Sequence, residues 1–415
     1  MLRSKKVVAL FSALILSQVS LIAQNNTNSP YTRFGWGQLA DPSFGAGKAM
    51  GGIGYGLRNN KQVNPLNPAS YSNVDSLTFM FDIGVTAQMS RFEQGGTSTK
   101  NINGNLEYIA MQFPIHKKLA VSIGLLPVSF VGYEYGSSEK VDGSDIYATQ
   151  VFNGTGGLSE VYGGISYKPF NRFSIGANIG YMFGSVTHNQ QVAYSSSDAY
   201  STTNIQKVRV SDMKFDLGIQ YTQPFGKDKS LTLGAVYSPK MKVNGTSYNY
   251  TIVGSSENQG DTIRGQKFDM PNSYGAGFTF VKKDKYMFGA DVLYQQWKDT
   301  RFFDNSEAFN NRFRVGFGGE YTPDAMARNI FKRMKYRAGA YVNNSYVKID
   351  NSGYDEYGAS IGFGIPMLDN RSVVNLVFEY VKIKPEISRL IDEQYFKFTV
   401  NYTFNERWFY KQKIK

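Results

Sequence analysis

The 415-residue chain contains no cysteine, and this absence excludes several chemistries at once. No disulfide can stabilise the fold, no thiolate can bind a metal or attack a substrate, and no lipid can be attached through a cysteine that follows an export signal. Histidine is almost absent as well, since only His116 and His188 occur, and they do not have the spacing of a metal site. The sequence therefore predicts no metal site and no cofactor.

Catalytic groups are equally scarce. A serine nucleophile would need His188 beside a serine and a carboxylate. Ser185, Ser195 and Asp198 lie nearby in the sequence, but a serine-rich segment supplies such neighbours by chance. We therefore predict that His188 faces solvent, that no residue is catalytic, and that the chain is not an enzyme.

Long apolar runs are missing beyond the N-terminus, where no segment approaches the roughly 18 apolar residues of a membrane-spanning helix. The N-terminus itself has basic residues before residue 7, an apolar run over 7–16, and small residues up to Ala23. This order is typical of a secretory signal peptide, so we expect residues 1–23 to be removed on export. An N-terminal membrane anchor is the alternative, but the apolar run is short for one.

What the chain does have is a period-two alternation of apolar and polar residues that stops and restarts along most of its length. It is clearest over 77–89, 173–183 and 396–404, where one face is hydrocarbon and the other is polar or glycine. These runs match the about nine to eleven residues of a membrane-crossing strand. About fourteen such segments are expected, an even number as in single-chain bacterial barrels. Their centres are Ile83, Ile109, Ile123, Ile165, Ile179, Leu217, Leu233, Phe278, Phe288, Phe317, Ala340, Ile361, Leu376 and Val400.

The connections alternate between short and long, as in outer-membrane barrels with short periplasmic turns and longer external loops. Links such as 169–172 are short, whereas 187–207 and 244–270 are long and follow odd strands, which places both chain ends on the periplasmic side. One short-side link, 323–335, has the spacing of an amphipathic helix, with a disordered basic turn as the alternative. The predicted fold class is all-β, a transmembrane antiparallel β-barrel; a soluble sandwich or propeller explains fewer of these features.

Charge adds to this interpretation. The formal net charge of +12 is scattered over turns rather than gathered in a basic cluster, so nucleic acid is not an expected partner and contact with anionic lipid headgroups is. Charges on the polar face of the strands should point into the lumen, because exposure to lipid is very costly. They form either a structural ion-pair network or a polar path, and they are Asp82, Lys214, Asp216, Asp291, Arg312, Arg314, Glu320, Arg337, Glu379 and Lys397.

Residues 24–74 show no alternation and are rich in glycine, asparagine and proline, yet they are too apolar for a solvated linker. A compact segment at the mouth of a wide barrel can fold into the lumen and plug it, whereas a disordered tail is the alternative. We therefore divide the chain into a signal peptide (1–23), an N-terminal hatch in the lumen (24–74), a barrel (75–405) and a periplasmic C-terminal tail (406–415).

Within this segment, the glycine-rich stretch 45–54, followed by Asn67-Pro68-Ala69 just before the first strand, resembles the hatch of the FadL/TodX family of outer-membrane transporters. That family combines a barrel of the same strand number with a small lumen hatch and a signal peptide. The chain departs from its pattern at 57–60, where family hatches often carry an acidic stretch, and in continuing past Phe404. The resemblance implies hatch roles for Gly51, Gly52, Gly54, Asn67, Pro68 and Ala69.

The resemblance also implies a function: passive uptake of hydrophobic small molecules, such as long-chain fatty acids, across the bacterial outer membrane. Its expected partners are outer-membrane lipids and a hydrophobic substrate. The family's lateral exit lies at a kink in the third strand, where Pro127 marks either such an exit or a neutral bulge. The alternative is a FadL-like accessory subunit of an outer-membrane secretion or assembly complex, with other outer-membrane or secreted proteins as partners. A lipid-modifying enzyme of the outer membrane is a remote alternative.

Overall fold

The computed structural model describes residues 26–407, apart from 42, 197, 255, 264, 265, 284, 304, 306, 308, 350, 368 and 370. The predicted signal peptide and the end of the predicted tail lie outside the described residues.

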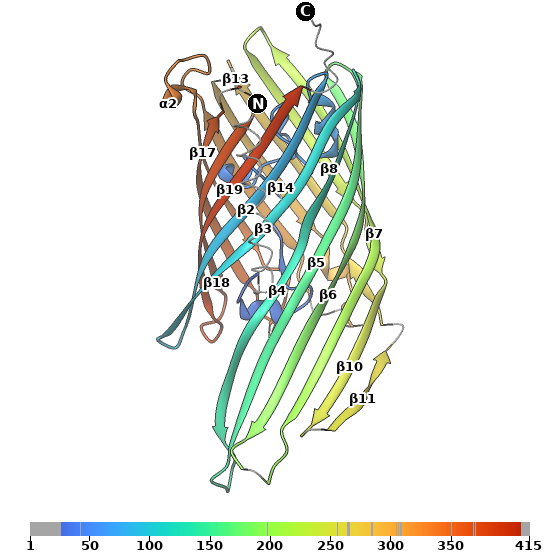
Figure 1. Ribbon diagram of the computed structural model, residues 1–415, viewed down its shortest axis with the longest axis vertical. Helices are drawn as coiled ribbons and strands as arrows, with labels where there is room; N and C mark the ends of the chain where they lie inside the picture. The colour runs from blue at the N-terminus through green and yellow to red at the C-terminus, as the bar shows by residue number, and fades with distance from the viewer. Residues whose placement is uncertain are drawn as a thin grey trace, which may run out of the picture.

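A closed antiparallel barrel of fourteen strands dominates the described chain (Figure 1), which confirms the predicted fold class. Neighbours in sequence pair with one another, β8 pairs with β13, and β19 pairs back with β2. Each predicted strand centre falls inside one of these strands, and the third predicted strand is β4. The strands are β2 (Thr78–Gln94), β3 (Thr97–His116), β4 (Leu119–Lys140), β5 (Tyr147–Phe170), β6 (Phe173–Tyr194), β7 (Thr202–Phe225), β8 (Lys229–Ser238), β13 (Ser273–Lys282), β14 (Tyr286–Gln295), β15 (Arg312–Tyr321), β16 (Lys335–Asn344), β17 (Tyr354–Pro366), β18 (Val373–Pro385) and β19 (Asp392–Arg407).

The remaining elements lie in the lumen or at the two ends of the barrel. The helix predicted in 323–335 is reduced to α2, four residues long; none of its residues is buried, so no packing favours a longer helix. These elements are η2 (Pro30–Arg33), β1 (Gln38–Leu39), η3 (Lys48–Met50), η4 (Pro68–Asn73), β9 (Met241–Val243), β10 (Gly245–Val253), β11 (Ser256–Ile263), β12 (Phe268–Met270), η5 (Trp297–Asp299) and α2 (Ile330–Arg333).

The outward face of the strands is an apolar band. On β6, Ile175 and Ile179 are 42% and 50% exposed, whereas Asn178 and Met182 between and beyond them are buried towards the lumen. Hydrocarbon outside and polar groups inside is the arrangement of a membrane barrel. Within the described residues, no helix is both long enough and apolar enough to cross a membrane.

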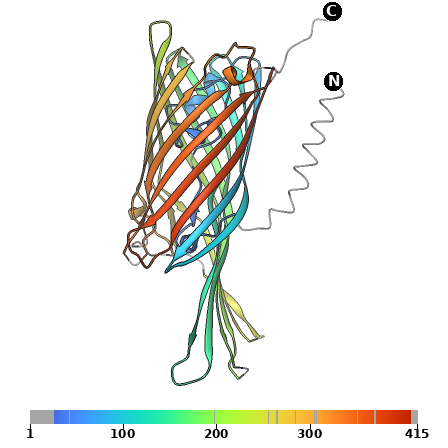
Figure 2. The same cartoon turned by 90° about the vertical axis from the view of Figure 1, so that its left-hand side faces the viewer.

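Strands β4 to β7 continue far past this band and project from one end of the barrel, with β10 and β11 added beside β7 (Figures 1 and 2). On β6 the apolar band ends at Phe183 and the strand ends at Tyr194. At about 3.3 Å per residue, the strand therefore continues for roughly 35 Å beyond the band, measured along the strand. We term this projection the outer sheet (131–140, 147–155, 187–194, 202–208, 245–253 and 256–263). The expectation of long loops over 187–207 and 244–270 was therefore largely wrong, because a strand with two polar faces carries no hydrophobic alternation.

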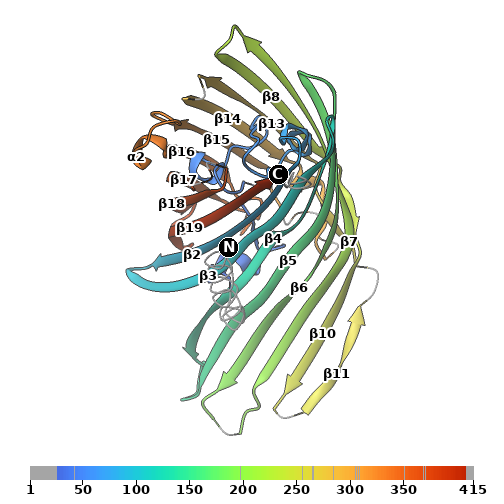
Figure 3. The same ribbon diagram turned by 45° about the horizontal axis from the view of Figure 1, so that its top comes forward.

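The first described part of the chain, residues 26–74, lies inside the ring of strands (Figure 3), and we refer to it as the hatch. It begins at the outer end of the barrel, where Ser29 donates to Glu393 at 2.7 Å and the Tyr31 hydroxyl donates to the carbonyl of Ile391 at 2.6 Å. The lengths of the connections predict that both chain ends lie on the periplasmic side. The first described residues lie instead at the opposite end, where long-range hydrogen bonds hold them.

Candidate functional site: the lumen hatch and the β3–β4 ladder break

Asn67, Pro68 and Ala69 form the corner where the hatch meets β5 to β8. The Asn67 side-chain oxygen accepts the Ala69 N–H at 3.1 Å and thereby caps η4. Its amide nitrogen donates to the carbonyl of Tyr55 at 2.7 Å and to that of Ile219 on β7 at 3.2 Å. One fully buried side chain thus closes a turn and ties the hatch to the wall.

Gly51 lies where the hatch touches β15 and β16. Its φ is +68°, and a Cβ there would lie 2.4 Å from the carbonyl oxygen of Ala340, so the position favours glycine. The wall also presents glycine: a Cβ on Gly339 would lie 2.2 Å from the Gly51 nitrogen, and one on Gly318 would lie 2.4 Å from the carbonyl oxygen of Met50. Two backbones therefore approach more closely than side chains would allow.

Asp291 on β14 fixes the next turn of the hatch. One of its carboxylate oxygens accepts the N–H groups of Gly54 and Tyr55, at 2.5 and 2.8 Å. The carboxylate is 5% exposed, so water does not replace these bonds easily. A charged acceptor that serves two buried donors is a strong anchor.

Ion pairs hold the middle of the hatch. Arg314 on β15 pairs with Asp41 at 3.1 Å and leaves room only for glycine at Gly52, while Lys48 pairs with Glu107 on β3 at 2.7 Å. Burial alone would raise the pKa of Asp41, but Arg314 and Lys48 together lower it to about 2. Burial alone would lower the pKa of Lys48, but Glu107 and other carboxylates raise it to about 12. Both hatch charges are therefore ionised at neutral pH.

The other predicted lumen charges also lie on the inner face, where they bond largely to neighbouring strands. A structural network is the proposal that these contacts support. Asp82 accepts the Tyr108 hydroxyl at 2.9 Å, Lys214 pairs with Asp216 at 3.1 Å, Arg312 donates to Asn343 at 2.9 Å, Glu320 pairs with Arg337 at 2.7 Å, Glu379 accepts the Tyr341 hydroxyl at 3.2 Å, and Lys397 lies 6.0 Å from the ring centre of Tyr395.

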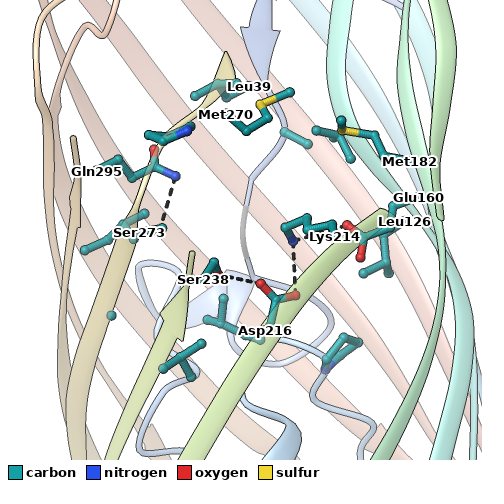
Figure 4. Close-up of a pocket in the computed structure, with 18 of the residues that line it drawn as sticks. Leu39, Leu126, Glu160, Met182, Lys214, Asp216, Ser238, Met270, Ser273 and Gln295 are labelled. Carbon is teal, nitrogen blue, oxygen red and sulfur yellow. Dashed lines mark hydrogen bonds and ion pairs between the residues drawn. The ribbon is translucent and has the colours of Figure 1, made fainter. Parts of the chain in front are cut away.

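A cavity of about 210 Å³ remains between hatch and wall (Figure 4). Leu39, Leu126 and Met182 form an apolar part of its lining, and Lys214 with Asp216 forms a charged part. Pockets for drug-sized ligands occupy about 300–1,000 Å³. This cavity is therefore small and only partly apolar.

β4 leaves β3 partway along the barrel. The β3–β4 ladder extends from His116↔Leu119 to Ile109↔Leu125, whereas β4 remains paired with β5 up to Lys140. A bulge follows Pro127, at the predicted kink. We term the stretch of β4 beyond Leu125 the ladder break.

The hatch covers the first part of the ladder break. β1 pairs antiparallel with β4 beside Phe130, and the Thr32 hydroxyl bonds both the N–H and the carbonyl of Gly132 at 3.2 Å. On the opposite side, Asn105 of β3 donates to the carbonyl of Asn26 at 2.9 Å. The N-terminal hatch residues thus take the place of β3 against β4.

His188 lies on the inner face of the outer sheet and is half-buried rather than solvent-facing. Its Nδ1 is 2.7 Å from the Tyr133 hydroxyl, and Ser185 points to the other face of β6. Burial, with a smaller contribution from Arg33, lowers the pKa of His188 to about 4. The described residues contain no cluster of three potential metal ligands. The second histidine, His116, is the last residue of β3, at the turn to β4.

Sequence reasoning missed the wall glycines and the covering of the ladder break. Gly318 and Gly339 stand on the lumen face of their strands, and that position was the available signal for close backbone approach. The pairing of β1 with β4 had no signal, because it joins backbone groups about 90 residues apart in a segment without periodicity.

Together, the apolar band, the closed strand order and the lumen hatch define a β-barrel of the bacterial outer membrane. Solved structures share this fold, which confirms the resemblance to FadL/TodX at the level of the fold. The Ralstonia pickettii toluene transporter TbuX matches with a TM-score of 0.61 and 14% identity over 89% of this chain and 99% of that one. The CymD monoaromatic hydrocarbon channel matches with a TM-score of 0.57 and 15% identity over 92% and 100%. A Pseudomonas aeruginosa FadL homologue matches with a TM-score of 0.55 and 14% identity over 88% and 97%.

A comparison of the sequence with models of protein families shows to which family the chain belongs. The model of the BamG family matches residues 3–415, so the chain belongs to the BamG family. No curated protein matches the chain. Among the solved structures that share its fold, CymD is named as a channel, and TbuX and the Pseudomonas putida TodX are named as toluene transporters.

Proposed function

We propose that this barrel is an accessory subunit of an outer-membrane secretion or assembly complex. The observation that carries the proposal is the outer sheet, which extends β4 to β7 well beyond the apolar band. On β6 its outward residues are Thr187, Asn189 and Gln191, so lipid does not cover this face. Each of these strands is hydrogen-bonded to at least one neighbour along its projecting length, so together they form a firm surface on which other proteins can bind.

The lumen supports the same proposal. The hatch is held by the Asn67 corner, by the close approach at Gly51 and by the Arg314–Asp41 pair. The cavity of about 210 Å³ is small for an extended acyl chain. The match to the BamG family model is a further hint of an accessory role.

A second candidate function is passive uptake of hydrophobic small molecules with a lateral exit at the ladder break. The end of the β3–β4 ladder at Leu125 and the bulge after Pro127 favour it. In this case the residues around Thr32, which bond to Gly132, would have to move before a molecule could pass.

Affinity purification of the tagged, full-length protein from native outer membranes tests the proposal. We expect a stable complex of fixed stoichiometry, and a deletion strain that takes up long-chain fatty acids as well as its parent. A protein that purifies alone, together with reduced uptake in the deletion strain, would favour the transporter instead.

A further inference from the structure

In the outer sheet, the edge of β4 that faces away from β5 has no described strand paired with it beyond the contact with β1. We infer that this edge, over 133–140, is a docking site for one extended strand of a partner protein at the cell surface, added antiparallel to β4. The inference rests on the proposed function, because it names the kind of partner and the site at which it binds.

Backbone direction shows that the edge is available. The N–H and carbonyl of Gly132 point away from β5, towards Thr32. Because these groups alternate along an antiparallel strand, those of Glu134, Gly136 and Ser138 point to the same side. The β4–β5 register is regular from Ser129 onwards, so no bulge changes this direction. No strand among the described residues pairs with β4 on that side beyond the contact with β1.

The edge also lacks most of the features that protect edge strands from pairing. Natural edges are blocked by lysine, proline, bulges or short length. Over 133–140 there is no proline and no bulge, and the single lysine, Lys140, lies at the far end, where it pairs with Asp145; Glu134 and Glu139 are the other charges. Eight residues up to Lys140 exceed the usual five or six of a strand, so the free edge can hold a whole added strand.

The hatch shows which direction the added strand takes. β1 already pairs antiparallel with the same edge, at Ser129 and Phe130. A strand in line with β1 would continue that pairing outwards from Tyr133. The β4 of a second copy in the same membrane cannot do so, because it would run parallel to this one; of its described strands, a second copy could offer only β11, the other edge of the outer sheet. The proposed function calls for a complex with other proteins, so the occupant that we infer is a different chain.

Arg33 specifies the chemistry of the occupant. Its guanidinium lies 3.9 Å from the ring centre of Phe152 on β5 and donates to the Tyr135 hydroxyl on β4 at 2.9 Å, on the inner face of the outer sheet. No described carboxylate lies within 4.0 Å of it. An acidic side chain on the inner side of the added strand would pair with this charge. Strand addition of this kind takes affinity from the backbone and specificity from such side-chain contacts.

Proline on the edge tests the inference. The double variant Glu134→Pro/Ser138→Pro removes two N–H groups that point towards the free edge and keeps the hydrogen bonds between β4 and β5. The double variant Glu134→Ala/Ser138→Ala keeps both N–H groups. In purification from native membranes, we expect the alanine pair to retain the partner and the proline pair to lose it at least tenfold. Heat-modifiable gel mobility verifies that both barrels are folded. A complex that survives the proline pair would overturn the inference and leave the proposed function standing, and absence of any complex would overturn both.

A labelling experiment needs no proline. The chain has no cysteine, so Ser137→Cys places a single thiol beside the edge, and Asp142→Cys places one in the exposed turn beyond it as the control. We expect an impermeant maleimide to label residue 137 at least fivefold more slowly in native membranes than in purified protein, with residue 142 unchanged. Equal rates at 137 would overturn the inference, as would a protecting chain identified by cross-linking as a second copy of this protein.

Discussion

Replacing Asp291 with alanine should release the hatch. In the native protein one buried carboxylate oxygen accepts two hatch donors, the N–H groups of Gly54 and Tyr55. Alanine removes the acceptor and puts nothing polar in its place. The donors would then be stranded in a site that is 5% exposed, and the hatch would gain by moving them towards water.

The size of the effect follows from the two bonds. Hydrogen bonds to a charged group contribute about 1.5–3 kcal/mol each, and an unpaired buried donor costs about 1–3 kcal/mol. Allowing for partial relaxation, the hatch should be held less tightly by about 2–5 kcal/mol. At about 1.4 kcal/mol for each tenfold change, the equilibrium constant for release rises by roughly 30-fold to several thousand-fold. Asp291→Asn keeps an oxygen acceptor and should show a much smaller increase.

Single-channel recording in planar bilayers measures the release directly. The alanine variant should show transient openings far more often than the parent protein. Asp142→Ala, which removes an exposed charge in the β4–β5 turn, is the matched control and should behave like the parent. If Asp291→Ala opens no more often than the control, while a barrel without its hatch does conduct, the reasoning about this anchor is refuted.

Three further predictions concern the hatch and the outer sheet. Gly339→Ala places a Cβ 2.2 Å from the Gly51 nitrogen, so overpacking should destabilise the barrel by about 1–3 kcal/mol, measured as a lower unfolding temperature by heat-modifiable gel mobility. Gly163→Ala is the control, because a Cβ there has no described atom within 4 Å, and it should not destabilise the barrel. Equal shifts in the two variants would contradict the close approach. Because burial lowers the pKa of His188 from 6.5 to about 4, its neutral form stabilises the outer sheet above about pH 6.5 and this contribution is lost as the pH falls towards 4. Hydrogen exchange should therefore quicken in the outer sheet on acidification, and a His188→Gln variant that quickens equally would argue against this cause. Deleting residues 25–70 should leave a barrel that inserts but leaks in planar bilayers, or that assembles poorly. If the deleted form inserts and conducts no more than the intact protein, this segment does not plug the barrel.

The outer sheet and the glycine contacts show where a sequence pattern stops being informative. Val151 and Asn153 of β5, and Thr187 and Asn189 of β6, lie in strands that neither lipid nor a core covers on the outward face. Without a medium that favours one face, polar and apolar residues do not alternate, and these strands look like loops in the sequence.

The barrel itself was determined by the sequence alone. Lipid on one side and a polar lumen on the other impose a period of two on every spanning strand, and all fourteen strands could be located from that period. The charges on the inner face followed from the same rule, since a charge such as Arg314 cannot face hydrocarbon at low cost.

Only the tertiary structure decided what those residues contact. The approach of Gly51 to Gly339, the two bonds from the hatch to Asp291, and the bond of Thr32 to Gly132 join positions at least 100 residues apart. They depend on barrel register and on backbone groups that every residue carries, so no local pattern encodes them. For the same reason the free edge of β4 could not be seen in the sequence: it exists because β3 turns away and the hatch covers only the first part of the space that β3 leaves.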